Sequence, residues 1–256
     1  FKRLPVKRYA LVCMLSLLGT IATAQQTSVS SPDGTLTVKL DLKNGHLFYQ
    51  VELEGKTMLE ASPLGLQSKT INLSDNLRPI AEKRGEILTN YNEPKIKRSQ
   101  VQYKANELRY VLENTSKQQI EVTFRVSNNN IAFRYYVPQV GEPANFALIK
   151  ENSGFKFPLV TTTFLTAQAS PMIGWMKTKP SYEEEYQADQ ALGVPSKYGV
   201  GYTFPALFHV GDRGWVLVSE TGVSSAYCAS KLSEGTKDGL YSISFPEEGE
   251  NNGIGR

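Results

Sequence analysis

Three consecutive carboxylates lie between two tyrosines in the stretch KPSYEEEY. Glu183, Glu184 and Glu185 repel one another at neutral pH, so such a run is stable where water solvates it or where a cation binds to it. If the stretch is extended, Glu183 and Glu185 point to one side, about 6.5 to 7 Å apart, and Glu184 points to the other side with Tyr182 and Tyr186.

Two carboxylates at that separation suggest the acid and nucleophile of a glycosidase. A catalytic pair flanks the bound sugar from opposed positions, however, whereas neighbours on one strand point from the same wall. Ca²⁺ fits the run better, because it accepts carboxylate oxygens at flexible angles and turns their mutual repulsion into attraction. From the residues alone, two interpretations of the run stay open: a solvated acidic turn and a Ca²⁺ site.

Other groups that could do chemistry are few. The only histidines are His46, in a predicted hairpin, and His209, in the strand-like run PALFHVG. Neither has a nearby nucleophile or a second ligand at metal spacing, so we expect structural roles for both. Glu220 follows the apolar run GWVLV, where a solvated turn is the simpler interpretation. The sequence has no glycine-rich phosphate loop and no HExxH, paired CxxC or GxSxG motif.

The elements that must position these residues are strands, because alternation of polar and apolar residues dominates from Gln25 onward. Thr35–Leu42 and His46–Leu53 both alternate, and Lys43-Asn44-Gly45 between them supplies a residue that adopts positive φ, which predicts a hairpin. A short helical turn over residues 181–190 stays open. Turn residues separate the further predicted strands, which are VQYKANELRYVLEN, QIEVTFRVS, IAFRYYVP, FALIKE, TTTFLTAQ, PALFHVG, GWVLVSETG and LYSISF.

At least ten short strands without alternating helices predict an all-β fold, a large antiparallel β-sandwich, with a barrel as the alternative. The length of 256 residues and the hydrophobic content of 40% are enough for one large core. No repeat of fixed period is present, which argues against a propeller or a solenoid.

The first 24 residues have the layout of a secretory signal peptide cut after Ala24. Four basic residues accompany an apolar run, Tyr9–Ile21, and small residues follow at the cleavage position. The apolar run is too short to span a bilayer comfortably. We therefore expect an exported protein in which residues 1–24 are removed and residues 25–256 form one β-sandwich domain, with the periplasm as its destination.

Removal of this segment leaves 24 basic residues against 25 acidic ones. That balance predicts no basic face for nucleic acid, and no later apolar run is long enough for a membrane span. Cys13 leaves with the segment and Cys228 remains alone, so no internal disulfide is expected. Stability must then come from the core.

Four stretches, in content and order, resemble the N-terminal domain of glycoside hydrolase family 97. The SPDGxLxV motif, the hairpin and the SPLGL motif are together the most specific features, and the likeness covers essentially everything from Ser28 to Arg256. The stretches are VSSPDGTLTVKLDLKNGHLFYQVELEGKTMLEASPLGL (Val29–Leu66), RVSNNNIAFRYYVP (Arg125–Pro138), PSYEEEY (Pro180–Tyr186) and GWVLVSETG (Gly214–Gly222).

The resemblance implies an exported, exo-acting α-glucosidase or α-galactosidase that acts on α-linked oligosaccharides. Such an enzyme combines this super-β-sandwich with a central (β/α)₈ barrel and a small C-terminal β domain. The barrel would hold the catalytic carboxylates, so we expect no catalytic residue in this chain and no activity from it alone. Phe1 in place of an initiator Met, and an end at Arg256 without a closing strand, fit a part of a longer polypeptide that stops before the barrel.

The resemblance also implies a Ca²⁺ ion at the active site, with one ligand from a Glu-Tyr pair of the sandwich. Glu185 and Tyr186 match that pair, and Glu183 and Glu184 are neighbouring alternatives because a triple run leaves the register uncertain. The implied role of the domain is to cap the barrel, its partner in cis, and to complete the pocket wall with this metal ligand.

Three aromatic residues have separate expectations. Aromatic faces pack on sugar rings, so Trp175 and Tyr182 are candidate pocket residues, although a core or interdomain role is equally open for Trp175. Trp215, within the predicted strand GWVLV, is expected in the core. A different class of function also stays open: a non-enzymatic carbohydrate-binding or scaffold module of the cell envelope has the same signal, strands and exposed tyrosines.

Overall fold

The computed structural model describes five stretches of the chain and one isolated residue: 26–95, 97, 99–138, 147–168, 185–224 and 230–245. The predicted signal peptide lies outside them. In these stretches the regular structure is almost entirely β, and the helical part is one short 3-10 turn, η2 (Gly211–Arg213). Nowhere in the described stretches is there a helix with the length and apolar character needed to cross a bilayer.

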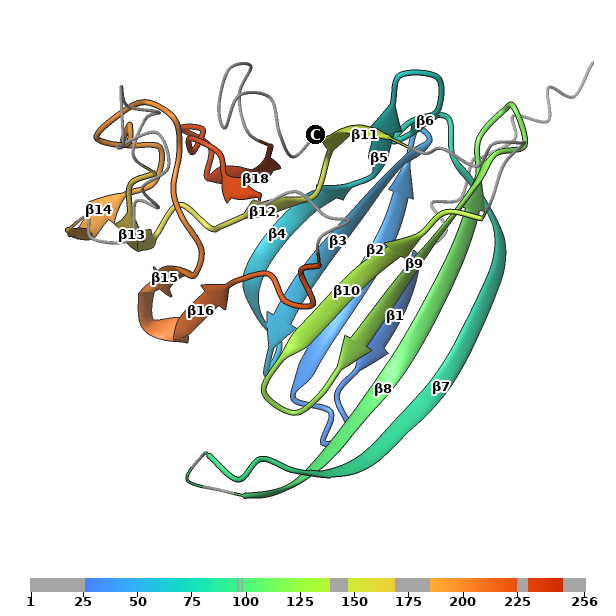
Figure 1. Ribbon diagram of the computed structural model, residues 1–256, viewed down its shortest axis with the longest axis horizontal. Coiled ribbons are helices and arrows are strands. Elements are labelled where there is room, and N and C mark those ends of the chain that lie inside the picture. Colours follow the sequence, from blue (N-terminus) through green and yellow to red (C-terminus); the bar gives the residue numbers. More distant parts are fainter. Residues whose placement is uncertain are drawn as a thin grey trace, which may run out of the picture.

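Two four-stranded antiparallel sheets face each other and form a sandwich (Figure 1). Strands β1 and β2 of the first sheet contact β8 and β9 of the second across the interior. The first sheet has the order β1-β2-β3-β4 and consists of β1 (Gln26–Ser30), β2 (Leu36–Lys43), β3 (His46–Leu53) and β4 (Lys56–Leu64). The second has the order β10-β9-β8-β7 and consists of β7 (Arg78–Asn92), β8 (Gln100–Glu113), β9 (Gln119–Val126) and β10 (Ile131–Tyr136). The predicted β-sandwich is confirmed.

The sandwich encloses a core because alternate residues of each strand point inward. On β8, Leu108, Tyr110 and Leu112 are buried at every second position. Tyr49 reaches across from the first sheet, and its ring centroid lies 5.7 Å from that of Phe124 in the second. These contacts hold the two sheets together through apolar packing, without a disulfide among the described residues.

The predicted hairpin between β2 and β3 is confirmed. Its two turn residues, Asn44 and Gly45, have φ angles of 51° and 78°, the conformation that a two-residue turn of type I′ requires. The strands pair from Leu36 with Leu53 to Lys43 with His46. A side chain at Gly45 would also collide with the backbone of the neighbouring loop, at a distance of 2.9 Å.

Strands β7 and β8 extend well beyond the rest of the sandwich (Figure 1). Strand β9 pairs with β8 only from Asn106 onward, whereas β7 continues to pair with β8 out to Asn92 and Gln100. We call the projecting part, residues 87–105, the arm. Because β7 is an edge strand with 13 of its 15 positions exposed, it has no polar–apolar alternation, and the period-two pattern of the sequence does not predict it.

Three smaller sheets complete the fold. The first has the order β11-β5-β6: β5 (Leu66–Ser68), β6 (Asn72–Leu73) and β11 (Leu148–Glu151). The second has the order β12-β18-β17: β12 (Gly154–Lys156), β17 (Lys231–Leu232) and β18 (Leu240–Ser244). The third has the order β14-β13-β15-β16: β13 (Thr161–Thr166), β14 (Tyr186–Ala191), β15 (Ala206–Val210) and β16 (Trp215–Val218). We call this third one the lateral sheet.

An aromatic cluster fixes the lateral sheet to the strands behind it. The rings of Phe157 and Phe208 stack with their centroids 3.9 Å apart, and Tyr241 of β18 approaches Phe208 at 5.2 Å. Tyr202 forms backbone bridges to Ala167 on one side and to β17 on the other. The inner side of the lateral sheet therefore packs as part of the same apolar core as the sandwich.

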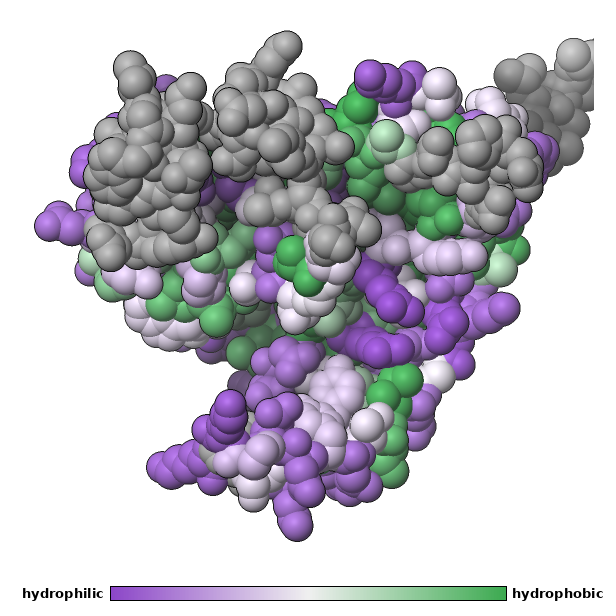
Figure 2. Space-filling view, viewed as in Figure 1, coloured by the Kyte–Doolittle hydropathy of each residue, from purple (hydrophilic) through white to green (hydrophobic). Residues whose placement is uncertain are grey.

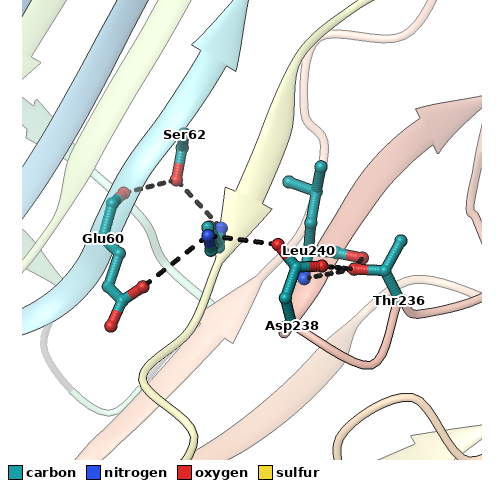
Figure 3. A network of polar contacts seen from close by, with 6 residues as sticks. Glu60, Ser62, Thr236, Asp238 and Leu240 are labelled. Atoms are coloured by element: carbon teal, nitrogen blue, oxygen red, sulfur yellow. Dashed lines mark hydrogen bonds and ion pairs between the residues drawn. The ribbon is translucent and has the colours of Figure 1, made fainter.

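A polar network joins β12 to the sandwich and to the turn before β18 (Figure 3). The backbone N–H of Lys156 donates to Ser62 Oγ at 2.9 Å, and its Nζ lies 3.1 Å from Asp238 and 4.0 Å from Glu60. The Thr236 hydroxyl donates to Asp238, and this bond, followed by that of Lys156, lowers the pKa of the Asp238 carboxyl. The carboxylate therefore stays ionised beside Lys156 at neutral pH.

The structure places a strand at each of the runs that alternation predicts. The open segment at residues 181–190 is described from Glu185 onward, and that part leads into strand β14 rather than a helical turn.

Candidate functional site

Glu185 directly precedes β14, an edge strand of the lateral sheet. The next residue, Tyr186, pairs with Thr166 of β13, and its ring centroid lies 5.1 Å from that of Phe164. The register between β13 and β14 shifts between Thr163 and Leu165. Strand pairing and the aromatic contact thus fix the backbone next to the carboxylate, while the carboxylate itself stands at the open end of the strand.

The carboxylate of Glu185 is exposed, and within the described part of the chain no hydrogen bond or ion pair holds it. The described residues contain no group of three His, Cys, Asp or Glu side chains that could hold a metal ion. A lone, solvent-accessible carboxylate is a hard oxygen donor, and it suits one position in a Ca²⁺ coordination shell of six to eight oxygens. Within the described stretches, Glu185 therefore does not belong to a complete metal site.

The remaining candidates of the acidic stretch are outside the described residues. The described residues do not include the alternative ligands Glu183 and Glu184. They also do not include Trp175 and Tyr182, the candidate pocket aromatics.

Trp215 is not a core residue, which corrects the expectation from the sequence. Its side chain is 55% exposed, while Val216 beside it is partly buried and Val218 is buried. In a strand, successive side chains point to opposite faces, so a continuous apolar run such as WVLV must expose half of its residues when only one face is covered. The ring of Trp215 stacks instead on His209 of β15, with centroids 4.3 Å apart.

The other singled-out polar residues have local partners. His46 shares a 3.0 Å hydrogen bond between its Nδ1 and the carbonyl oxygen of Ser74. It borders a depression of about 390 Å³ between the sandwich and β11, with Phe48 and Asn152 among the lining residues. Glu220 follows β16 and accepts a 2.8 Å hydrogen bond from the Ser230 hydroxyl. Neither arrangement brings together groups for acid–base or nucleophilic chemistry.

Sequence comparison assigns the family. The profile of the family described as Glycosyl-hydrolase 97 N-terminal matches residues 29–248. This chain is a glycosyl-hydrolase 97 N-terminal domain. The resemblance inferred from the SPDGxLxV and SPLGL motifs is thereby confirmed.

Known relatives of this family 97 domain are longer enzymes. A crystal structure of a beta-arabinopyranosidase superposes with a TM-score of 0.86 at 48% identity, and the match covers 91% of this chain and 37% of that one. A protein named probable retaining alpha-galactosidase, from Streptomyces bingchenggensis (strain BCW-1), is 26% identical over 241 residues, which are 89% of this chain and 35% of the relative. The chain thus spans little more than a third of the length of either relative.

More distant relatives support the fold alone. A glycoside hydrolase family 97 enzyme from Pseudoalteromonas sp. strain K8, solved in complex with acarbose, has a TM-score of 0.71 at 19% identity, with 86% of this chain and 32% of that chain covered. The super-sandwich architecture persists at that level of sequence divergence.

Two features of the fold are not predicted by the sequence: the apolar outer side of the lateral sheet and strand β7. The first had a signal in the run GWVLV, since a short strand that is apolar at every position carries apolar side chains on both of its faces. The second had none, because an exposed edge strand leaves no period in the sequence.

Proposed function

We propose that the full-length protein is an exported, Ca²⁺-dependent, exo-acting glycoside hydrolase, and that this domain caps its catalytic part. The observation that carries the proposal is the 48% identity with a beta-arabinopyranosidase over 91% of this chain, within a family defined by glycosyl hydrolases. The catalytic carboxylates would lie in the remainder of the polypeptide, so the domain would not hydrolyse glycosides by itself.

The proposed substrates have the hydroxyl arrangement of galactopyranose. The two similar enzymes with substrate names are a beta-arabinopyranosidase and a probable alpha-galactosidase. In its L form, β-arabinopyranose has the same ring configuration as α-D-galactopyranose and lacks only the hydroxymethyl group at C6. A pocket for one ring therefore accepts the other, unless it closes on C6, whereas glucose differs in the orientation of its hydroxyl at C4.

In the proposed enzyme this domain contributes one side chain to the active site. Glu185 would supply a carboxylate oxygen to a Ca²⁺ ion, with its position set by the pairing of Tyr186 and the contact of that ring with Phe164. When bound, the ion would fix a substrate hydroxyl and provide positive charge beside the acidic groups. The exposed strand end keeps Glu185 accessible to a shared site, which supports this role.

Export is the remaining part of the proposal. The basic residues, the apolar run and the small residues at Ala22-Thr23-Ala24 support removal of residues 1–24 and delivery to the periplasm.

The test is hydrolysis of aryl glycosides by the full-length protein. We expect turnover of the α-galactoside and the β-L-arabinopyranoside, with kcat/KM at least about tenfold above that for the α-glucoside, because an epimeric hydroxyl leaves polar groups of the pocket unpaired. Chelation with EDTA should abolish turnover, and added Ca²⁺ should restore it. Preference for the α-glucoside would contradict the proposed substrate class. Turnover that is insensitive to EDTA would contradict the metal dependence. Sugar binding without any hydrolysis would support a non-enzymatic binding module instead.

A further inference from the structure

The outer side of the lateral sheet carries an apolar and aromatic surface that crosses all four strands. The pairing registers place Phe164 of β13 opposite Leu207 of β15, and Leu207 opposite Leu217 of β16. Opposite residues in an antiparallel pair point to the same side of a sheet. We call this surface the lateral face, and its members are Tyr186, Phe164, Leu207, Leu217, His209 and Trp215.

Three side chains of the lateral face are open to solvent. Tyr186 is 60% exposed, Trp215 is 55% exposed and Leu217 is 62% exposed. Figure 2 shows apolar side chains on the surface of the lobe that holds β13, β15 and β16. A contiguous apolar surface of this kind on a folded domain marks an interaction site, whereas single exposed apolar residues do not.

The outer side of the sandwich at β8 and β9 is polar, unlike the lateral face. On the outer side of β8 and β9, Glu107 pairs with Arg109 and Arg125 at 2.6 and 2.7 Å, respectively. That surface has the polar composition expected where one side of an antiparallel sheet meets water. The lateral sheet has apolar side chains on both sides, as in a sheet covered on both sides.

We propose that the lateral face docks against the C-terminal remainder of the full-length polypeptide. This inference rests on the proposed function for the existence of that remainder and adds the surface that holds it. The match covers 37% of the beta-arabinopyranosidase, so in a protein of that length the 63% outside the match is larger than this domain and is covalently attached to it. Permanent interfaces are more hydrophobic than transient ones, in line with a tryptophan, a leucine and a tyrosine at the surface.

The position of Glu185 points to the same occupant. The residue directly precedes Tyr186, which belongs to the lateral face through its contact with Phe164. A partner seated on the lateral face therefore lies next to the exposed carboxylate, and one docking event both buries the apolar surface and brings the proposed metal ligand to the catalytic part. A second copy of the domain would bury the apolar surface but would give no role to Glu185.

The test is the reactivity of a cysteine placed on the lateral face of the full-length protein. Leu217→Cys removes an exposed side chain from an edge strand, and Lys69→Cys, in the exposed turn between β5 and β6, is the control. Labelling with a maleimide, corrected for the native cysteines by the unsubstituted protein, should be at least tenfold slower at Leu217→Cys than at Lys69→Cys. The protection should be the same at all protein concentrations and should disappear when Trp215→Glu is added.

Three results would overturn the inference. Equal labelling of the two cysteines would show that the lateral face is open to solvent in the full-length protein. Protection that fades on dilution would assign the face to a second copy. Slow labelling that persists in Trp215→Glu, with the fold intact by circular dichroism, would place the contact elsewhere. Because labelling requires no turnover, a protected Leu217→Cys in a protein without glycosidase activity would refute the proposed function and leave the docking face standing.

Discussion

Replacement of Glu107 by glutamine tests how the outer side of the sandwich is stabilised. The carboxylate is 6% exposed and accepts hydrogen bonds from Arg109 Nε at 2.6 Å and Arg125 Nε at 2.7 Å, while the two arginine side chains are 43% and 39% exposed. Hydrogen bonds to charged groups contribute about 1.5 to 3 kcal/mol each, and neutral ones about 1 kcal/mol. Since water reaches both guanidinium groups and offsets part of the loss, we expect Glu107→Gln to lower the free energy of unfolding by about 1 to 2 kcal/mol at pH 7.

The pH dependence gives this prediction a second signature. Burial alone would raise the pKa of the Glu107 carboxyl, but the hydrogen bonds from Arg109 and Arg125 outweigh burial and hold the pKa below the usual value of 4.5. A carboxyl whose pKa is lowered by folding stabilises the protein fully above its unfolded pKa, and this contribution is lost as the pH falls through the folded pKa. The difference between the parent protein and Glu107→Gln should therefore be full at pH 7 and shrink as the pH falls below 4.5 through the lowered pKa of the carboxyl.

Hydrogen exchange in the full-length protein is the suitable assay, because it reports the opening of β8 and β9 without two-state unfolding of the whole. Peptides from these strands should exchange about 5 to 30 times faster in Glu107→Gln at pH 7, which corresponds to 1 to 2 kcal/mol. This ratio should fall as the pH is lowered below 4.5. Glu86→Gln, at an exposed position of β7, is the matched control and should change exchange little. An unchanged rate at pH 7, or a difference that stays constant down to pH 3, would refute the reasoning.

Two further predictions concern the lateral sheet. Phe208→Ala removes a fully buried ring that stacks on Phe157 with the centroids 3.9 Å apart. In exchange or thermal measurements it should lower the free energy of unfolding by about 3 to 5 kcal/mol. A loss below about 1 kcal/mol would show that the aromatic cluster does not support the sheet. Gly201→Ala should lower the free energy of unfolding by about 1 to 3 kcal/mol, because φ is 95° and a Cβ would overlap the carbonyl oxygen of Leu232. The control Gly34→Ala has a φ of 78° with open space around it, so it should cost about 1 kcal/mol. Equal effects of the two substitutions would contradict the steric argument.

Much of the sandwich could be predicted because its strands have one side exposed to solvent and one side buried in the core. The run from Thr35 to Leu42 alternates, the turn at Asn44 and Gly45 has the residue types that positive φ requires, and the structure contains the resulting hairpin. Strand β8 alternates as well, with Leu108 and Tyr110 inside. Local chemistry and long-range packing agree in these elements, so the sequence pattern was sufficient to predict them.

Strands whose two sides have the same environment could not be predicted in the same way. Both sides of strand β7 are exposed to solvent, so polar and apolar residues do not alternate along it. In β16, the run from Trp215 to Val218 is apolar throughout. The sequence alone does not tell whether this domain buries both sides of such a strand or leaves one side exposed. The error at Trp215 thus has a physical origin, since a strand that is apolar at every position has the same sequence pattern whether one or both of its sides are covered.

The candidate metal ligand rests on both sources. The acidic run suggested a cation from charge repulsion alone, and the Glu-Tyr pair singled out Glu185 through the family resemblance. The structure adds that Glu185 is exposed at a strand end and anchored by its neighbour Tyr186. Ca²⁺ binding itself stays a prediction.

Calorimetric titration of Ca²⁺ into the metal-free full-length protein tests the central proposal most directly. The comparison is between the unsubstituted protein, Glu185→Gln and the control Glu86→Gln, all at the same pH and ionic strength. A lost charged ligand should weaken Ca²⁺ affinity at Glu185→Gln by about 10-fold or more and lower hydrolysis in parallel, with Glu86→Gln unchanged. Ca²⁺ affinity and hydrolysis that are identical in all three proteins would contradict the assignment of Glu185 to the metal.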